Sequence, residues 1–259
     1  ESDGFTSEDF TVARLKTRLF EQSYVGGIYT RRDPRNGSDP SHTAGLDARF
    51  STSTFMGSEN LVAALWMLYA TQEQSSSGNS AFGGSVMYPN DRWDARFEIA
   101  EVQENFDPDI GFVTRRGYRR FSPELDFLPR PANHPYIRQF EFGGTLDAKT
   151  DLQNDMLTRT IDFTLLQLNL HSGDMGSISA NHNYERLDEP FEITDDITLP
   201  LGAEYNFARY GLWMQTANRR VLAVSMRYDA GDFYSGSREE RVFNLTVRAR
   251  PGLIIGFNG

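Results

Sequence analysis

The chain has no cysteine, which excludes disulfides and thiolate chemistry. It has no run of about 18 apolar residues, so the sequence contains no transmembrane helix. Basic residues are not in excess: 26 Lys and Arg stand against 36 Asp and Glu, and the net charge of −10 argues against a nucleic-acid partner. P-loop, dinucleotide and Gly-x-Ser-x-Gly motifs are also missing. We therefore expect no nucleic-acid partner and no cofactor.

Several segments of the chain alternate between apolar and polar residues. In residues 92–99, Trp93, Ala95, Phe97 and Ile99 fall on one side, and the charged residues between them fall on the other. This period of two is typical of a β-strand with one apolar and one polar face. The same pattern recurs in residues 43–54 and 241–250, so the sequence predicts an all-β protein.

Strands are expected over about thirteen segments. Residues 60–71 are apolar on both faces and also fit a helix, but neighbouring strands of similar length favour a strand. The expected strands are 10–20, 23–31, 43–54, 60–71, 81–89, 92–102, 134–147, 156–171, 177–187, 203–216, 221–228, 241–250 and 252–258.

One strand carries a break in its pattern. Within residues 156–171, the apolar positions are Ile161, Phe163 and Leu165, and then shift by one to Leu166 and Leu168. Such a slip is what a β-bulge produces, so a bulge is predicted here.

The connections are alternately tight, as at 90–91 and 172–174, and long, as at 32–41 and 188–202. This asymmetry, with strands near ten residues long, favours an antiparallel up-and-down transmembrane β-barrel, or an incomplete segment of one. We expect about 13–14 strands and a single domain or barrel fragment over residues 1–259. The alternative is a soluble, lectin-like β-sandwich that acts as a binding module.

The stretch from Asn105 to Val113 (NFDPDIGFV) departs from the alternation, and a basic run follows it. This stretch resembles a motif of an uncharacterised bacterial outer-membrane family, in which a β-barrel follows a domain similar to family 9 carbohydrate-binding modules. Weaker matches extend the resemblance from about Phe10 to Gly236: FTVARLK at 10–16, SYVGGI at 23–28, PRP at 129–131, EPF at 189–191 and FYSG at 233–236.

The resemblance implies a location in the outer membrane of a Gram-negative bacterium, with the lipid bilayer as a partner. It implies a non-enzymatic pore, transporter or membrane anchor linked to carbohydrate capture. The carbohydrate-binding-like domain and the closing C-terminal strands are expected to be absent here. Because an unpaired sheet edge promotes aggregation, a missing segment or a partner chain is expected to close the barrel. A surface hydrolase that uses acidic lumen residues is a weaker alternative.

The candidate site residues line a lumen or belong to the family motif. Arginines in a lumen would attract a small anionic solute, and the alternative is that they pair with Glu98 or Glu101. The candidates are Asn105, Phe106, Asp107, Pro108, Gly111, Phe112, Arg115, Arg116, Arg119 and Arg120.

No metal site is expected. The four histidines (His42, His134, His171 and His182) are scattered, although His171 and His182 flank one expected hairpin and could meet across it. Carboxylates around Asp107 and Asp109, and at Asp195–Asp196, have the chemistry of a calcium site, but a solvent-facing acidic rim is favoured. Aromatic residues near strand ends suit an interfacial girdle: Trp66, Tyr69, Tyr88, Trp93, Trp213 and Tyr228.

Overall fold

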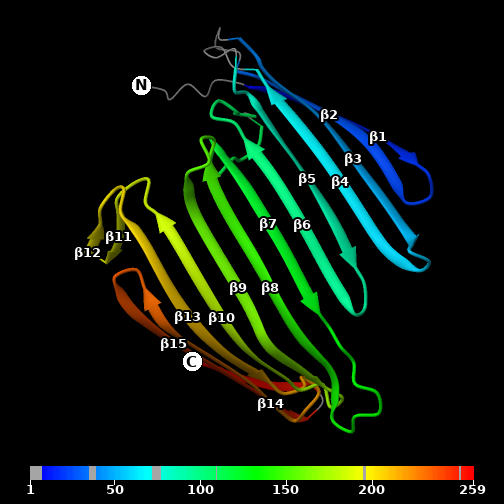
Figure 1. Ribbon diagram of the computed structural model, residues 1–259, viewed down its shortest axis with the longest axis vertical. Helices are drawn as coiled ribbons and strands as arrows, with labels where there is room; N and C mark the ends of the chain where they lie inside the picture. The colour runs from blue at the N-terminus through cyan, green and yellow to red at the C-terminus, as the bar shows by residue number, and fades with distance from the viewer. Residues whose placement is uncertain (1–7, 35–38, 72–76, 109, 195–196, 251) are drawn as a thin grey trace. The chain divides into compact units, whose positions relative to one another are not determined.

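The computed structural model describes residues 8–34, 39–71, 77–108, 110–194, 197–250 and 252–259. Fourteen strands form one antiparallel sheet in the order β1-β2-β3-β4-β5-β6-β7-β8-β9-β10-β13-β14-β15-β16, and β11 pairs with β12 in a separate two-stranded sheet. Each strand of the large sheet therefore lies beside its neighbour in the chain, with β11 and β12 as an insertion (Figure 1). The all-β, antiparallel, up-and-down prediction is confirmed.

The strands of the large sheet have the following bounds: β1 Asp9–Leu19, β2 Ser23–Asp33, β3 Ser41–Phe55, β4 Glu59–Ala70, β5 Ser80–Pro89, β6 Trp93–Val102, β7 Tyr118–Phe127, β8 Ile137–Asp151, β9 Met156–Leu170, β10 Met175–Arg186, β13 Glu204–Gln215, β14 Leu222–Phe233, β15 Gly236–Arg250 and β16 Leu253–Asn258. The small sheet consists of β11 Phe191–Thr194 and β12 Ile197–Leu199. The described residues contain no helix that could cross a membrane.

The contacts divide the chain into two compact units. Unit 1 comprises Glu1–Pro89, Arg96–Ser122 and Lys149–Asp155, and unit 2 comprises Asn90–Ala95, Pro123–Ala148 and Met156–Gly259.

In unit 1 the register sorts side chains onto two different faces. Residues that lie opposite one another on neighbouring strands share a face, and the register places Leu46 opposite Met67 and Leu65 opposite Gly84. These apolar side chains are exposed, with Leu46 at 72% and Leu65 at 61%. We call this side the apolar face, and the side that carries Asp47 the polar face. The apolar face of unit 1 also holds Leu15, Phe82, Val86, Phe97, Ile99 and Phe121.

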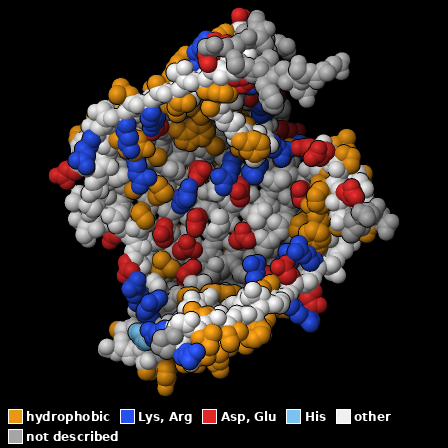
Figure 2. Space-filling view, turned by 180° about the vertical axis from the view of Figure 1, so that it is seen from behind, with side chains coloured by type: hydrophobic (Ala, Val, Ile, Leu, Met, Phe, Trp, Pro, Cys, Tyr) orange, Lys and Arg blue, Asp and Glu red, His pale blue; other side chains and the backbone are white. Residues whose placement is uncertain are grey.

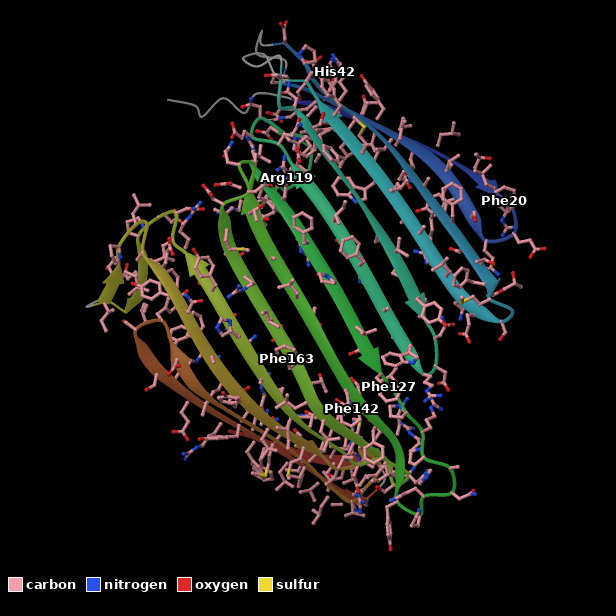
Figure 3. The ribbon with its side chains drawn as sticks, viewed as in Figure 1. Phe20, His42, Arg119, Phe127, Phe142 and Phe163 are labelled. Carbon is pink, nitrogen blue, oxygen red and sulfur yellow. The ribbon has the colours of Figure 1, made fainter. Side chains whose placement is uncertain are left out.

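Unit 2 has the same division. The register places Leu212 opposite both Ile178 and Tyr228, and Phe243 opposite Met226, and all five side chains are exposed. Phe142 on β8 and Phe163 on β9 belong to this apolar face (Figure 3). The positions between them carry polar side chains, which form the polar face of unit 2: Asp126, Glu141, Asp162, Asn181, Arg227 and Asp229.

Closure of the sheet into a barrel is not shown. Among the described residues, β1 is bonded only to β2, and β16 only to β15. The transmembrane barrel therefore remains a hypothesis, and the open up-and-down sheet is the finding.

The β-bulge prediction is confirmed. Opposite β10 the register jumps from Leu166 to Thr164, at Ile178 and Ser179, so Leu165 is the extra residue. After this residue, Leu166 takes the face that Phe163 holds before it. Residues 60–71 form strand β4 and not a helix.

One strand of the large sheet was missed in the sequence, and so were the two short strands β11 and β12. Residues 118–127 form β7, although Pro123 lies inside it. Proline removes one ladder donor, but N–H groups along an antiparallel strand point alternately to the two neighbours, so only one bond is lost. A second miss is the tight turn at Tyr234, where φ is 51°, which joins β14 directly to β15.

Candidate functional site: the polar face and its rim

The polar face of unit 1 is lined by charges that compensate one another. Arg14 lies 2.5 Å from Asp47 across β1 and β3. The carboxylate of Glu98 accepts hydrogen bonds from Arg96 at 2.6 Å and from Arg120 at 3.3 Å. Figure 2 shows Lys, Arg, Asp and Glu side chains on the hollowed face, with several Asp and Glu side chains lying together near its centre. At these positions of unit 1 the opposite charges therefore neutralise one another.

The connection between β6 and β7 folds against this polar face. Its Phe106 is only 3% exposed and packs in a cluster with Ala70, Ala81 and Val102. The side chains of Trp66, Leu68, Val113 and Tyr118 pack against the same cluster. Trp66 lies opposite Asp47 in the register, which places the cluster on the polar side. The stretch singled out in the sequence is therefore a loop anchored at the rim of unit 1.

Hydrogen bonds hold this rim loop to the β4–β5 connection. The backbone N–H of Asn105 donates to Gly78 O at 2.9 Å, and its side-chain amide donates to Ser77 O at 2.9 Å. The backbone N–H of Gln103 donates to Ser80 O at 3.0 Å. The hydroxyl of Thr43 donates to Pro108 O at 3.2 Å. Two long connections of unit 1 are thereby bonded together.

The remaining motif residues have structural contacts. Arg116 pairs with Asp107 at 2.5 Å. Gly111 has a φ of 154°, a conformation that disfavours a side chain, and a Cβ there would lie 3.4 Å from Pro108. Phe112, in contrast, is 88% exposed. The motif therefore builds the rim loop, with one aromatic residue inside and one outside.

The four arginines do not gather in one place. Arg119 and Arg120 are adjacent in β7 and therefore point to opposite faces. Arg119 donates to Glu101 at 2.7 Å and to Asn154 Oδ1 at 2.7 Å, and Arg120 pairs with Glu98 on the polar face. Arg119 is labelled in Figure 3. The pairing with Glu98 and Glu101 is thus confirmed. Arg115 lies half-buried in the rim loop.

The long connection of unit 2 is also anchored by aromatic residues. Tyr234 contacts the rings of Phe191 and Tyr205 at centroid distances of 5.5 and 5.2 Å. Its hydroxyl donates to Glu185 at 2.7 Å. Burial, together with the hydrogen bond to Glu185, raises the pKa of Tyr234 well above its ordinary value. The turn missed in the sequence therefore holds the β11–β12 hairpin in place.

At the opposite strand ends of unit 2, Asp174 joins two turns. It accepts from the backbone N–H of Ala217 at 2.8 Å, from Arg220 Nε at 3.0 Å and from the Ser172 hydroxyl at 2.8 Å. The hydrogen bond from Arg220, followed by those from Ala217 and Ser172, lowers the pKa of Asp174 to about 2.

The histidines do not form a cluster. His42 bonds the Tyr29 hydroxyl at 2.7 Å, and His171 Nε2 lies 3.2 Å from the carbonyl of His134. The register places His182 opposite Ile161, away from the turn that holds His171, so these two histidines do not meet. Among the described residues, no group of three or more His, Asp or Glu could hold a metal ion. Asp109 and Asp195–Asp196 lie outside the described residues.

Two of the three tryptophans do not fit the girdle that the sequence suggested. Trp66 lies opposite Asp47, and Trp213 lies opposite Ser177 and Arg227, so both belong to the polar face. Only Trp93 shares its side of the strand with Phe97. The alternation of polar residues around Trp213 (Gly211, Gln215) was the signal that could have placed it.

Comparison of this chain with family models, with curated proteins and with solved structures finds no match.

Proposed function

We propose that this chain is a membrane-spanning β-barrel, or a segment of one, from a bacterial outer membrane. Its apolar face contacts lipid, and its polar face lines a passage for small polar solutes. The protein acts as a non-enzymatic pore, transporter or membrane anchor.

The observation that carries the proposal is the continuous exposure of large apolar side chains on one face of each unit. Burying one Leu or Phe side chain is worth about 1.5–3 kcal/mol. Each unit exposes many such residues, among them Met67, Phe97, Phe163 and Tyr210. Exposed apolar surface beyond a few hundred Å² marks a protein or membrane contact. Lipid supplies that contact along every strand at once.

The polar face supports the second half of the proposal. Transmembrane barrels place apolar residues outward and polar residues inward on each strand. Here, ion pairs such as Arg14–Asp47 and Arg227–Asp229 satisfy the charges on the inward side. The strands in the sheet are mostly ten to fifteen residues long, which suits tilted membrane strands.

The lectin-like sandwich would need a second sheet over the apolar face. Among the described residues, the separate sheet has only the two short strands β11 and β12. Of the acidic residues that a hydrolase could use, Asp107 in the rim loop is engaged by Arg116. We therefore favour the membrane barrel over both alternatives.

The test is gel mobility of the full chain folded in detergent, compared unboiled and boiled. A closed barrel resists the gel detergent and migrates faster before boiling. Ion conductance across planar bilayers then tests the passage. Identical migration, together with solubility in the absence of detergent, would contradict the proposal.

A further inference from the structure

The polar face of unit 2 contains a hollow of about 410 Å³ on β10, β13, β14 and β15. On this face the hollow is lined by Trp213 and Arg227, by small or polar residues between them, and by the aliphatic Val242, which lies opposite Arg227. These four strands are consecutive neighbours in the sheet and are hydrogen-bonded to one another, so the lining does not depend on any loop.

Small residues create the hollow. A Cβ at Gly211 would lie 2.5 Å from Ser179 Oγ and 3.0 Å from Asp229 Oδ1, so glycine alone allows these two groups to approach each other. Serine occupies the neighbouring positions Ser177 and Ser225. These small residues therefore form the base of the hollow, and the larger side chains of Trp213 and Arg227 form its sides.

The lining combines an aromatic ring with donors and acceptors. Asn244 Nδ2 donates to Ser225 Oγ at 3.1 Å. Arg227 Nε lies 2.5 Å from Asp229 Oδ2, so the two charges cancel and no net charge favours an ion. Serine hydroxyls both donate and accept, the amide does the same, and an indole ring offers an apolar surface.

We propose that this hollow is a subsite for a neutral, polyhydroxyl solute of about monosaccharide size. The apolar C–H side of the solute lies on Trp213, while its hydroxyls bond Ser177, Ser179 and the Arg227–Asp229 pair. The subsite rests on the proposed function, because it lies on the face that lines the passage. Binding in a passage must be weak enough for the solute to leave, so we expect millimolar affinity.

The experiment is saturation-transfer NMR with methyl α-glucoside on the full chain folded in an amine-oxide detergent, which carries no sugar headgroup. Two variants address the subsite. Ser179→Leu fills the hollow above Gly211, and Trp213→Ala removes the aromatic surface. The matched control is Tyr210→Ala, which removes an aromatic side chain from the same strand. Tyr210 lies on the opposite, apolar face and is 63% exposed. Gel mobility of each variant verifies that it folds.

We expect a saturable signal for the wild type and for Tyr210→Ala. Affinity should fall about tenfold or more in Ser179→Leu and about three- to tenfold in Trp213→Ala. The charged analogue glucuronate should bind less tightly than methyl α-glucoside. No saturable signal from the folded wild type, or equal affinity in Ser179→Leu, would overturn the subsite.

The binding measurement needs no current, so it separates the two proposals. A chain that conducts ions but does not bind methyl α-glucoside overturns the subsite alone. A folded chain that binds the sugar at this hollow but does not conduct ions supports the subsite and contradicts an open pore.

Discussion

A lysine on either face of β7 distinguishes a lipid-facing surface from a water-facing one. Phe121 and Ser122 are adjacent in the middle of this strand and point to opposite faces. Phe121 lies with Val86 and Phe97 on the apolar face and is 41% exposed. Ser122 shares the polar side with Arg120. The pair Phe121→Lys and Ser122→Lys therefore adds the same charge one residue apart.

If the apolar face contacts lipid, Phe121→Lys places an ammonium group near the membrane midplane. This costs about 2–4 kcal/mol in a transmembrane barrel. Ser122→Lys stays in a polar lining and should change stability by no more than about 0.5 kcal/mol. The predicted difference between the two variants is therefore about 1.5–4 kcal/mol.

The assay is urea unfolding of each variant in phospholipid vesicles, followed by gel mobility of unboiled samples. We expect a lower urea midpoint for Phe121→Lys alone. In water, a lysine at a surface position costs little. Equal midpoints for the two variants would therefore refute the assignment of this face to lipid.

Three further changes test other parts of the structure. Asp174→Asn should remove a pH-dependent stabilisation: since folding lowers the pKa of Asp174 to about 2, its contribution is complete above pH ~4 and is lost as the pH falls towards 2. Thermal melts should therefore show a wild-type loss of stability on acidification that the variant lacks. Arg220→Gln should weaken the same dependence without abolishing it, because Ala217 and Ser172 still donate to Asp174. Phe106→Ala should lower the stability of the rim loop by about 3–5 kcal/mol and make it susceptible to protease. Phe112 is 88% exposed, so Phe112→Ala should leave the rate of cleavage unchanged. Gly231→Ala should destabilise unit 2 by about 1–3 kcal/mol, because φ is 149° and a Cβ would lie only 2.3 Å from Ala208 O, and an unchanged urea midpoint would contradict this geometry.

Local alternation was enough to predict most of the fold. The apolar positions Trp93, Phe97 and Ile99 placed β6, and the one-residue slip at Leu165 placed the bulge, because side-chain direction in a strand depends only on position. The strand β7 was hidden by Pro123, since proline is disfavoured in a ladder and tolerance of it depends on the neighbouring strands.

The candidate site was less predictable, because it depends on which strands meet. The sequence marked the segment around Phe106 as unusual, but its packing on Ala70 and Ala81 requires the β4–β5 hairpin. The hollow at Trp213 was missed because its lining comes from four strands, and each contributes only one to three small or polar residues. Closure of the sheet depends on contacts that no local pattern specifies.

Whether the apolar face contacts lipid is measured most directly by quenching of single tryptophans on the two faces by brominated lipid. The first variant carries Phe97→Trp on the apolar face, and the second keeps only the native Trp213 on the polar face. All other tryptophans are replaced by phenylalanine, and both proteins are folded into vesicles whose acyl chains carry bromine. We expect strong quenching at position 97 and little quenching of Trp213. Equal quenching at the two positions, or none at position 97, would contradict a lipid-facing apolar side and a polar side turned away from lipid.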